Sequence, residues 1–505
     1  MNTSLSKHHM SPRPRIFLLA ALGLVACGPP PRVVPLVIDN VTVIDPAGGD
    51  VLAGHSVFIE GTRIAGIEPS GRGGAFVATD SVDGTDRFVI PGLIDMHVHL
   101  FNRENVASPT LDLLLANGVT GFREMASDCW DQDRDGAVCT EALRAMSHEI
   151  REGTRVGPRP LGLSSAPING VSQRSGLPEG APPFLAPETE ADGRELARWL
   201  ADRDIDLVKV YNSVPRDAYF GLMEEAAGID LEVSGHLPLG VSVVEASNAG
   251  HRTIEHARDL PVACGDYSEP YRAIMARVVD GEDGVEAPSA EVRLRTILDA
   301  FDEARCARVL ETLAANGTVL VPTHGTREMD YRASDSAYRA DDRFQYMLEP
   351  IRDGWNRDLD RTAQASPELV ELFGEFYALG LRLSGMAHAA GVQVLAGTDS
   401  NDTMIFPGFG LHDELERFGE AGISPMDVLR TATSASAEHL GEPELGTVSV
   451  GAMADLVILD QDPLADIRNT RSIEWVILGG QVHDRAALDA LLQGVEAVAR
   501  NSAEG

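Results

Sequence analysis

The chain has 505 residues, a hydrophobic content of 44% and a formal net charge of −35 at pH 7. This length and composition exclude a disordered or fibrous protein and allow one large domain plus a smaller one. The negative charge argues against nucleic acid and anionic membrane surfaces as partners, because both would repel the protein.

The N-terminus is typical of a bacterial export signal. Basic residues precede an apolar run over residues 16–25, which is too short to span a membrane. The run closes on Leu-Val-Ala-Cys, and this end at Cys27 resembles a lipobox, in which the cysteine is lipidated. We expect residues 1–26 to be a lipoprotein-type signal peptide and residues 27–35 a tether. The protein would then be exported to the periplasmic side of the cell envelope. Cys27 would be its lipid anchor and its only contact with the membrane. The alternative is an ordinary secretory signal in which Cys27 is incidental.

The other cysteines agree with export. Cys129, Cys139, Cys264 and Cys306 remain, an even number in a compartment that permits disulfides. Pairing 129 with 139 and 264 with 306 is the local choice among the three connectivities that four cysteines allow.

Both ends of the remaining chain contain short β-rich segments separated by Gly, Asn and Asp. These segments are residues 33–38, 41–45, 55–60, 63–67, 455–460 and 475–482. Two distant β-rich ends most simply pack together. We therefore expect residues 36–88 and 441–505, the latter with a tail, to form one accessory β-sandwich.

Residues 89–440 alternate strands with helices. The predicted strands end within residues 95–99, 121–123, 160–163, 207–211, 232–236, 253–256, 319–323 and 392–398, and helical patterns such as 188–203 and 241–249 lie between them. Eight strands of this kind predict an α/β fold with a TIM-type (β/α)8 barrel. Chemistry in that fold takes place at the carboxyl ends of the strands.

The first of these strands ends in His97-Val98-His99. Residues i and i+2 of a strand face the same side, so both imidazoles would converge on one point. Imidazole is the commonest protein ligand for transition metals. By itself the pair also fits a chance occurrence on a half-buried strand.

Later strands end in further groups that can bind a metal. Strand four carries Lys209, strand five ends in His236, strand six in His256, and strand eight in Asp399. A lone histidine on a strand is more often a hydrogen-bonded core residue than a ligand. The complete set, at matching strand ends, indicates a metal centre.

The order H-x-H, Lys, His, His, Asp resembles the amidohydrolase superfamily, and the resemblance extends from residue 34 onward. The segments 209–211, 235–236, 255–256 and 411–415 are more specifically similar to exported members grouped with Xaa-Pro and Xaa-Arg dipeptidases. Imidazolonepropionase is also similar, but it holds one metal and lacks the lysine on strand four. Lys209 is therefore the residue that separates the two interpretations.

The resemblance implies two divalent metal ions. The implied ligands are His97, His99 and Asp399 for the first metal, His236 and His256 for the second, and a Lys209 carbamate with a hydroxide as bridges. A lysine buried between cations favours its neutral amine, which can react with CO2 to form that carbamate. Such ligands suit Zn²⁺, with Mn²⁺, Co²⁺ or Fe²⁺ as alternatives.

The resemblance also suggests catalytic and substrate-binding residues. Asp399 would take a proton from the attacking hydroxide and pass it to the leaving amine. Tyr211 would donate a hydrogen bond to the oxyanion, unless it only packs. His324 is a candidate substrate contact. Arg123 would bind a substrate carboxylate or, alternatively, form an internal salt bridge.

Residues 131–136 have the alternating acids and the glycine of a Ca²⁺ loop. The twelfth position is Ala142, where such a loop needs a bidentate Glu, although Glu141 is adjacent. The segment fits either a calcium site or a solvated acidic loop.

Residues 325–390 are rich in Asp, Arg and aromatic side chains and have a helical pattern. Insertions of this length in a barrel are usually functional, so we expect this segment to cover the barrel mouth.

The sequence therefore predicts a metal-dependent hydrolase that cleaves an amide (C–N) bond of a small substrate, such as a dipeptide or an N-acyl amino acid, with a metal-bridging hydroxide. One alternative is a mononuclear cyclic-amide hydrolase or deaminase similar to imidazolonepropionase. Another is a lipoprotein that uses an inactive barrel to bind a ligand. The sequence does not identify the substrate or the oligomeric state, and a homo-oligomer is one possible state.

Overall fold

A computed structural model describes residues 1–2, 31–71, 74–130 and 136–502. The predicted signal peptide with Cys27 and residues 131–135 of the predicted calcium loop lie outside these ranges. Among the helices within these ranges, none combines the length and apolar composition needed to cross a membrane.

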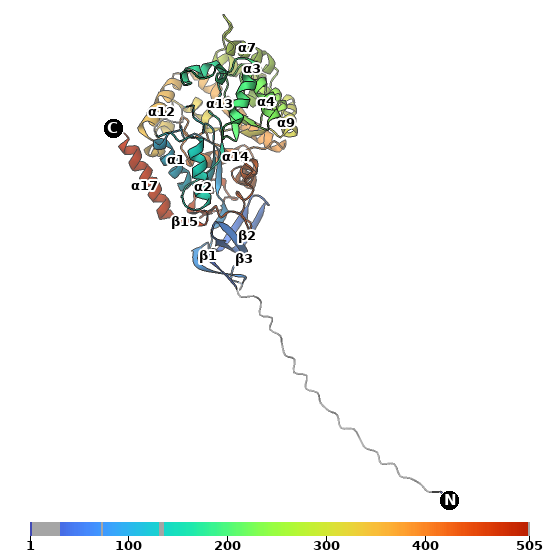
Figure 1. Cartoon of the computed structure of the whole chain (residues 1–505), viewed down its shortest axis with the longest axis vertical. Helices are drawn as coiled ribbons and strands as arrows, with labels where there is room; N and C mark the ends of the chain where they lie inside the picture. The colour runs from blue at the N-terminus through green and yellow to red at the C-terminus, as the bar shows by residue number, and fades with distance from the viewer. Residues whose placement is uncertain (3–30, 72–73, 131–135, 503–505) are drawn as a thin grey trace.

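One eight-stranded sheet is built from both ends of the chain. Its strands are β1 (Arg32–Asp45), β2 (Asp50–Glu60), β3 (Arg63–Pro69), β4 (Phe76–Asp83), β5 (Phe88–Pro91), β13 (Leu456–Leu459), β14 (Ile473–Leu478) and β15 (Gln481–Asp484). The order is β15-β14-β13-β5-β1-β2-β3, and β4 also pairs with β1. Figure 1 shows β1, β2 and β3 together at one end of the molecule. The expected accessory β-sheet domain is present, while its division into two packed layers stays a prediction.

Two strands expected from the sequence form the single strand β1. Asn40 lies in the left-handed region, with φ 56°, and the pairing register with β2 shifts between Ile38 and Val41. Asparagine tolerates this conformation better than most residues, so the chain bulges there without ending the strand. The first half of β1 then pairs with β4 and the second half with β5.

The middle of the chain contains two parallel sheets. They comprise β6 (Leu93–Val98), β7 (Val119–Glu124) and β8 (Arg159–Leu163), and β9 (Leu207–Val210), β10 (Glu232–Gly235), β11 (Thr253–Glu255) and β12 (Val319–Val321). Helices that alternate with these strands include α1 (Glu104–Ala116), α2 (Thr140–Arg151), α3 (Glu190–Ala201), α4 (Arg216–Gly228), α5 (Val243–Asn248), α9 (Glu303–Asn316) and α14 (Phe409–Glu420). This order confirms the α/β class.

The predicted eighth strand differs from the other seven. Residues 392–398 form no ladder; instead, Val394 bridges Leu320 of β12, and the carbonyl of Ala396 accepts the N–H of Met96 in β6 at 2.9 Å. The N–H of Ala396 donates to the carbonyl of Thr431 instead of to a neighbouring strand, so regular pairing stops there. The segment nevertheless lies between β6 and β12. A parallel bridge between β8 and β9 joins the two sheets on their other side.

The segment expected to cover the strand ends is helical. It contains α10 (Gly325–Arg332), α11 (Ser336–Arg339), α12 (Glu349–Thr362) and α13 (Pro367–Ala389). Trp355 of α12 is buried, and its Nε1 donates to the carbonyl of Asn401 at 3.2 Å. This bond ties α12 to the loop that follows Asp399.

Both local disulfides are present. Cys129 pairs with Cys139 and Cys264 pairs with Cys306, and all four side chains are buried. Of the three connectivities that the sequence allows, the structure therefore contains the local one.

Candidate active site

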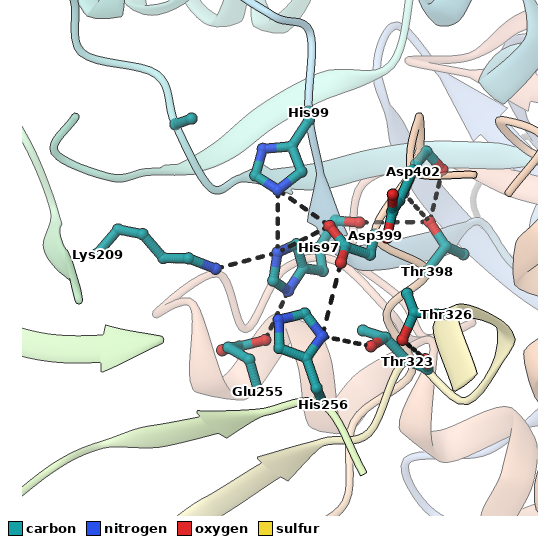
Figure 2. A network of polar contacts seen from close by, with 12 residues as sticks. His97, His99, Lys209, Glu255, His256, Thr323, Thr326, Thr398, Asp399 and Asp402 are labelled. Atoms are coloured by element: carbon teal, nitrogen blue, oxygen red, sulfur yellow. Dashed lines mark hydrogen bonds and ion pairs between the residues drawn. The ribbon is translucent and has the colours of Figure 1, made fainter. Parts of the chain in front are cut away.

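The two histidines of the H-x-H motif converge at the end of β6. His97 is 1% exposed and His99 is 8% exposed, and their Nε2 atoms lie 3.2 Å apart. Oδ1 of Asp399 lies 3.0 Å from Nε2 of His99 and 3.4 Å from Nε2 of His97 (Figure 2). Period-two spacing therefore placed both imidazoles on one side, as predicted, and the third group comes from the segment after residue 398.

Lys209 enters the same cluster from β9. Its side chain is fully buried, and Nζ lies 3.1 Å from Nε2 of His97. The sequence holds only two lysines, Lys7 and Lys209, although Lys and Arg together number 42. Burial lowers the pKa of Lys209 to about 8. A lowered pKa raises the fraction of neutral amine, which is the form that reacts to give a carbamate.

His236 and His256 form the second part of the cluster. Their ring centroids lie 4.4 Å apart, and Nδ1 of His256 lies 3.6 Å from Oδ2 of Asp399. Nδ1 of His236 and Nε2 of His256 are buried without a hydrogen-bond partner among the described residues. A buried polar atom without a partner costs about 1–3 kcal/mol. Both atoms therefore fit a site that is completed by a metal ion.

The protonation of the histidines agrees with this fit. Burial, reinforced by the charge of Lys209, lowers the pKa of His97 to about 4. Burial also lowers the pKa of His236 and of His256 well below the usual range. At neutral pH these imidazoles are uncharged, which is the form that binds metals. His97, His256 and Asp399 each offer one ligand atom within 4.8 Å of the others.

Backbone strain is concentrated at the same strand ends. His256, Thr323 and Asp399 all have positive φ, at 68°, 44° and 69°. Non-glycine residues in this region cost on the order of 1–3 kcal/mol each and occur mainly at functional sites. Oγ1 of Thr323 lies 2.7 Å from Nδ1 of His256 and so orients that ring.

Glu255 positions His97 from behind the cluster, a role that the sequence interpretation missed. Its Oε2 accepts from Nδ1 of His97, and its Oε1 accepts from Nη2 of Arg123, both at 2.7 Å. Burial favours the neutral acid, but the charges of Arg123 and His97 outweigh it and hold the pKa of Glu255 below its usual value. Because Nδ1 carries the proton, the Nε2 lone pair of His97 faces the site. The available signal was a buried Glu on a strand, which needs a cationic partner.

Arg123 itself has an internal role. It is fully buried, its Nε donates to the carbonyl of Met96 at 2.7 Å, and Nη2 is bound to Glu255. The structure therefore favours the internal salt bridge over the predicted contact with a substrate carboxylate.

Replacing Glu255 by Gln is expected to weaken metal binding about 10- to 100-fold, because an amide orients and polarises His97 less well than a carboxylate. Metal retention against chelators of graded strength measures this change. Glu232→Gln is the matched control, since Glu232 is a strand acid in β10 whose carboxylate accepts a hydrogen bond from Ser234. Equal retention in Glu255→Gln and in the unmodified protein would contradict the positioning role.

The candidate site opens into a pocket of about 1020 Å³. His99, Tyr211, His236, His256 and Asp399 line it together with residues of the helical cover, among them Leu348, Ile351 and Trp355. Pockets of this size accommodate small-molecule ligands. The segment 325–390 therefore contributes to the pocket wall, as expected.

Tyr211 and His324 differ in their relation to this pocket. The ring of Tyr211 lies 4.2 Å from that of His236, centroid to centroid, and borders the pocket. His324 is fully buried, and its Nε2 lies 3.0 Å from Oγ of Ser384 in α13. His324 is therefore not part of the pocket wall, and its contact with a substrate stays a prediction. The left-handed backbone of Thr323 precedes it, and the N–H of His324 donates to Glu414 as α10 begins.

Comparisons with solved structures support the fold. A bottromycin amidohydrolase has a TM-score of 0.66 and 20% sequence identity, covering 92% of this chain and 90% of that one. A Xaa-Pro dipeptidase with bound methionine has a TM-score of 0.60 and 17% identity, covering 89% of this chain and 99% of the other. At these identities the likeness concerns the fold alone.

Comparisons with curated proteins give shorter matches. An adenine deaminase of Bradyrhizobium sp. is 26% identical over 166 residues, which is 32% of this chain and 25% of the relative. An adenine deaminase of Rubrobacter xylanophilus is 31% identical over 86 residues, 17% of this chain and 14% of the relative. The chain thus spans a quarter or less of the length of these relatives.

The model of the amidohydrolase family matches residues 211–482, more than half of the sequence. This match includes His236, His256 and Asp399 of the cluster described above. The chain therefore belongs to the amidohydrolase family.

Proposed function

We propose that this protein is a metal-dependent hydrolase that cleaves an amide bond of a small substrate, such as a dipeptide or an N-acyl amino acid. The observation that supports this most is the position of Lys209, a fully buried amine 3.1 Å from a histidine of the cluster. A (β/α)8 barrel is the architecture that the bridges between the parallel sheets favour. Export and lipidation at Cys27 belong to the same proposal and rest on the sequence.

The residues present fit two divalent cations. His97, His99 and Asp399 would hold one, His236 and His256 the other, and a carbamate on Lys209 would be shared between them. Zn²⁺ suits such nitrogen and oxygen ligands, and Mn²⁺, Co²⁺ and Fe²⁺ are alternatives. When bound, such ions polarise a carbonyl and lower the pKa of water to near neutrality.

Asp399 is the residue best placed to move protons. Interaction with the protonated form of His97 and the hydrogen bond from His99 outweigh the effect of burial and hold the pKa of Asp399 well below its usual value. Its carboxylate is therefore ionised and can accept a proton from the attacking water. The same group can then deliver that proton to the departing amine.

Tyr211 would stabilise the charge that develops on the scissile carbonyl. Its side chain borders the pocket beside His236, and burial raises the pKa of Tyr211 above its usual value. The phenol therefore stays protonated and can donate a hydrogen bond to a developing oxyanion.

The adenine deaminase matches favour a deaminase as the second candidate function. Metal content separates the two candidates. Protein purified with bicarbonate is expected to contain about two transition metals per chain, as a bridged site requires. Chelation should abolish amide hydrolysis, and Zn²⁺ should restore it. A content near one, with ring opening of cyclic amides or release of ammonia from nucleobases, would instead support the mononuclear alternative.

A further inference from the structure

Two arginines form part of the wall of the catalytic pocket. Arg258 follows His256 by two residues, and Arg327 lies in the first turn of α10, which follows β12. Both therefore lie after neighbouring parallel strands, at the sheet edge that carries the metal-ligand cluster. The sequence interpretation assigned neither residue a role.

Arg258 lacks an acid of its own. Its side chain is 25% exposed, and its Nε lies 3.3 Å from Oδ2 of Asp259. The other oxygen of Asp259 already accepts from Nη2 of Arg272 at 2.7 Å, so one carboxylate serves two guanidinium groups. Nη2 of Arg258 is buried and has no hydrogen-bond partner within the described part of the chain. A guanidinium has five N–H donors, so Arg258 has capacity for a further acceptor.

Two further acids of the pocket wall, Asp128 and Asp358, pair with other arginines. Asp128 accepts from Nη2 of Arg203 at 2.7 Å, and Asp358 pairs with Arg361 at 2.8 Å. Neither is therefore a dedicated partner for Arg258.

Arg327 adds to the positive charge without supplying an acceptor. Its Nη1 donates to Asp330 at 3.0 Å, and its charge opposes the rise that burial causes in the pKa of Asp402. Arg258 and Arg327 both line the pocket, so an anionic group bound there can interact with either guanidinium group.

The pocket wall carries charges of both signs, which are supplied by Arg103, Arg258 and Arg327 and by Asp128, Asp358, Asp399 and Asp402. The chain has a formal charge of −35, yet Arg258 lines the same pocket as His236 and His256 of the cluster. Metal ions bound to the cluster would add further positive charge on the same side of the pocket. An anionic ligand group would neutralise both, and the planar fork of arginine matches a carboxylate.

We propose that Arg258, with Arg327 beside it, binds a carboxylate of the substrate, so that the substrates are anionic amides such as dipeptides or N-acyl amino acids with a free carboxylate. This inference rests on the proposed amide hydrolysis and narrows its substrate class. Neutral substrates, such as a purine base, would leave Arg258 without its partner.

The test compares N-acetyl-L-leucine with N-acetyl-L-leucinamide, with acetate release as the readout. The enzyme is expected to prefer the acid about 100-fold in kcat/KM, the size of a charge-assisted pair of hydrogen bonds. Arg258→Gln should raise KM for the acid about 100-fold with little change in kcat, and leave the amide nearly unaffected. Arg258→Lys should keep part of the preference because it retains the charge.

Arg500→Gln is the matched control, since Arg500 is an exposed arginine of α17 (Arg485–Asn501) that pairs with Glu496. It should keep the full preference for the acid. Metal content and thermal midpoint are measured for every variant, so that misfolding is recognised. A correctly folded Arg258→Gln or Arg258→Lys enzyme with the same acid preference as the unmodified enzyme would overturn the assignment.

Direct binding distinguishes failure of this inference from failure of the proposed hydrolysis. If neither compound is cleaved, both are titrated calorimetrically into the metal-loaded protein. One outcome is that the unmodified protein binds the acid but not the amide, and that Arg258→Gln binds neither. This outcome would support the carboxylate site and contradict the proposed hydrolysis of these amides. Equal binding of both compounds, or unchanged binding of the acid to Arg258→Gln, would exclude the carboxylate site.

Discussion

Lys209→Ala is expected to reduce amide hydrolysis by at least about 10³-fold, because it removes the group that both metal ions would share. Alanine also leaves an empty space at a fully buried position, next to Nε2 of His97. Metal content should fall together with the activity. Elemental analysis and kcat/KM, measured on the same preparations, test the two effects.

Lys209→Arg is the matched control for this substitution. Arginine retains a positive charge and much of the volume, but its guanidinium stays protonated and forms no carbamate. We therefore expect it to be as inactive as Lys209→Ala. A Lys209→Ala protein with full metal content and an unchanged rate would defeat the binuclear proposal.

Asp399→Asn is the second change for which we expect a large effect. Asparagine keeps an oxygen near His97 and His99 but accepts no proton, so kcat should fall by about 10³- to 10⁴-fold, in the range of a lost general base. The loss of metal should be smaller than in Lys209→Ala, since one oxygen donor remains. The measurement is kcat as a function of pH, together with metal content.

The control for this prediction is Asp45→Asn in β1. Asp45 is half-buried and accepts from Oγ1 of Thr447 in the accessory part of the protein, so its loss should leave kcat unchanged. If Asp399→Asn retained its metal and a normal kcat, another residue would have to move the proton.

Much of the candidate site follows from residue types and strand periodicity. His97 and His99 converge because side chains two residues apart on a strand share a face. Lys209, His236 and His256 were expected at the ends of successive strands, and the structure brings them to the carboxyl end of one four-stranded parallel sheet. Periodicity is local, so it is readable without knowledge of the packing.

The differences from expectation arise where the backbone leaves that periodicity. Thr323, at φ 44°, turns the chain after β12, and His324 consequently faces α13 instead of the pocket. Asn40 similarly turns two expected strands into one bulged strand. A left-handed residue within an otherwise extended segment has little sequence signal, because asparagine and threonine are common in ordinary loops as well.

Groups that act through other residues were also hard to predict. Glu255 was visible beside His256, but its partners, His97 and Arg123, come from β6 and β7. Such contacts depend on tertiary packing, which sequence spacing does not specify. The sequence also does not show that Arg258 and Arg272 share Asp259, because this contact depends on tertiary packing as well.

The near absence of lysine gives this protein a spectroscopic advantage. Lys209 is the only lysine in residues 27–505, where arginine supplies every other basic side chain apart from histidine. Protein equilibrated with ¹³C-labelled bicarbonate should therefore give a single side-chain carbamate resonance, already assigned without mutagenesis. The same scarcity means that amine-directed crosslinkers and dyes find no surface lysine, so an enzyme cleaved before Cys27 would need carboxyl-directed attachment.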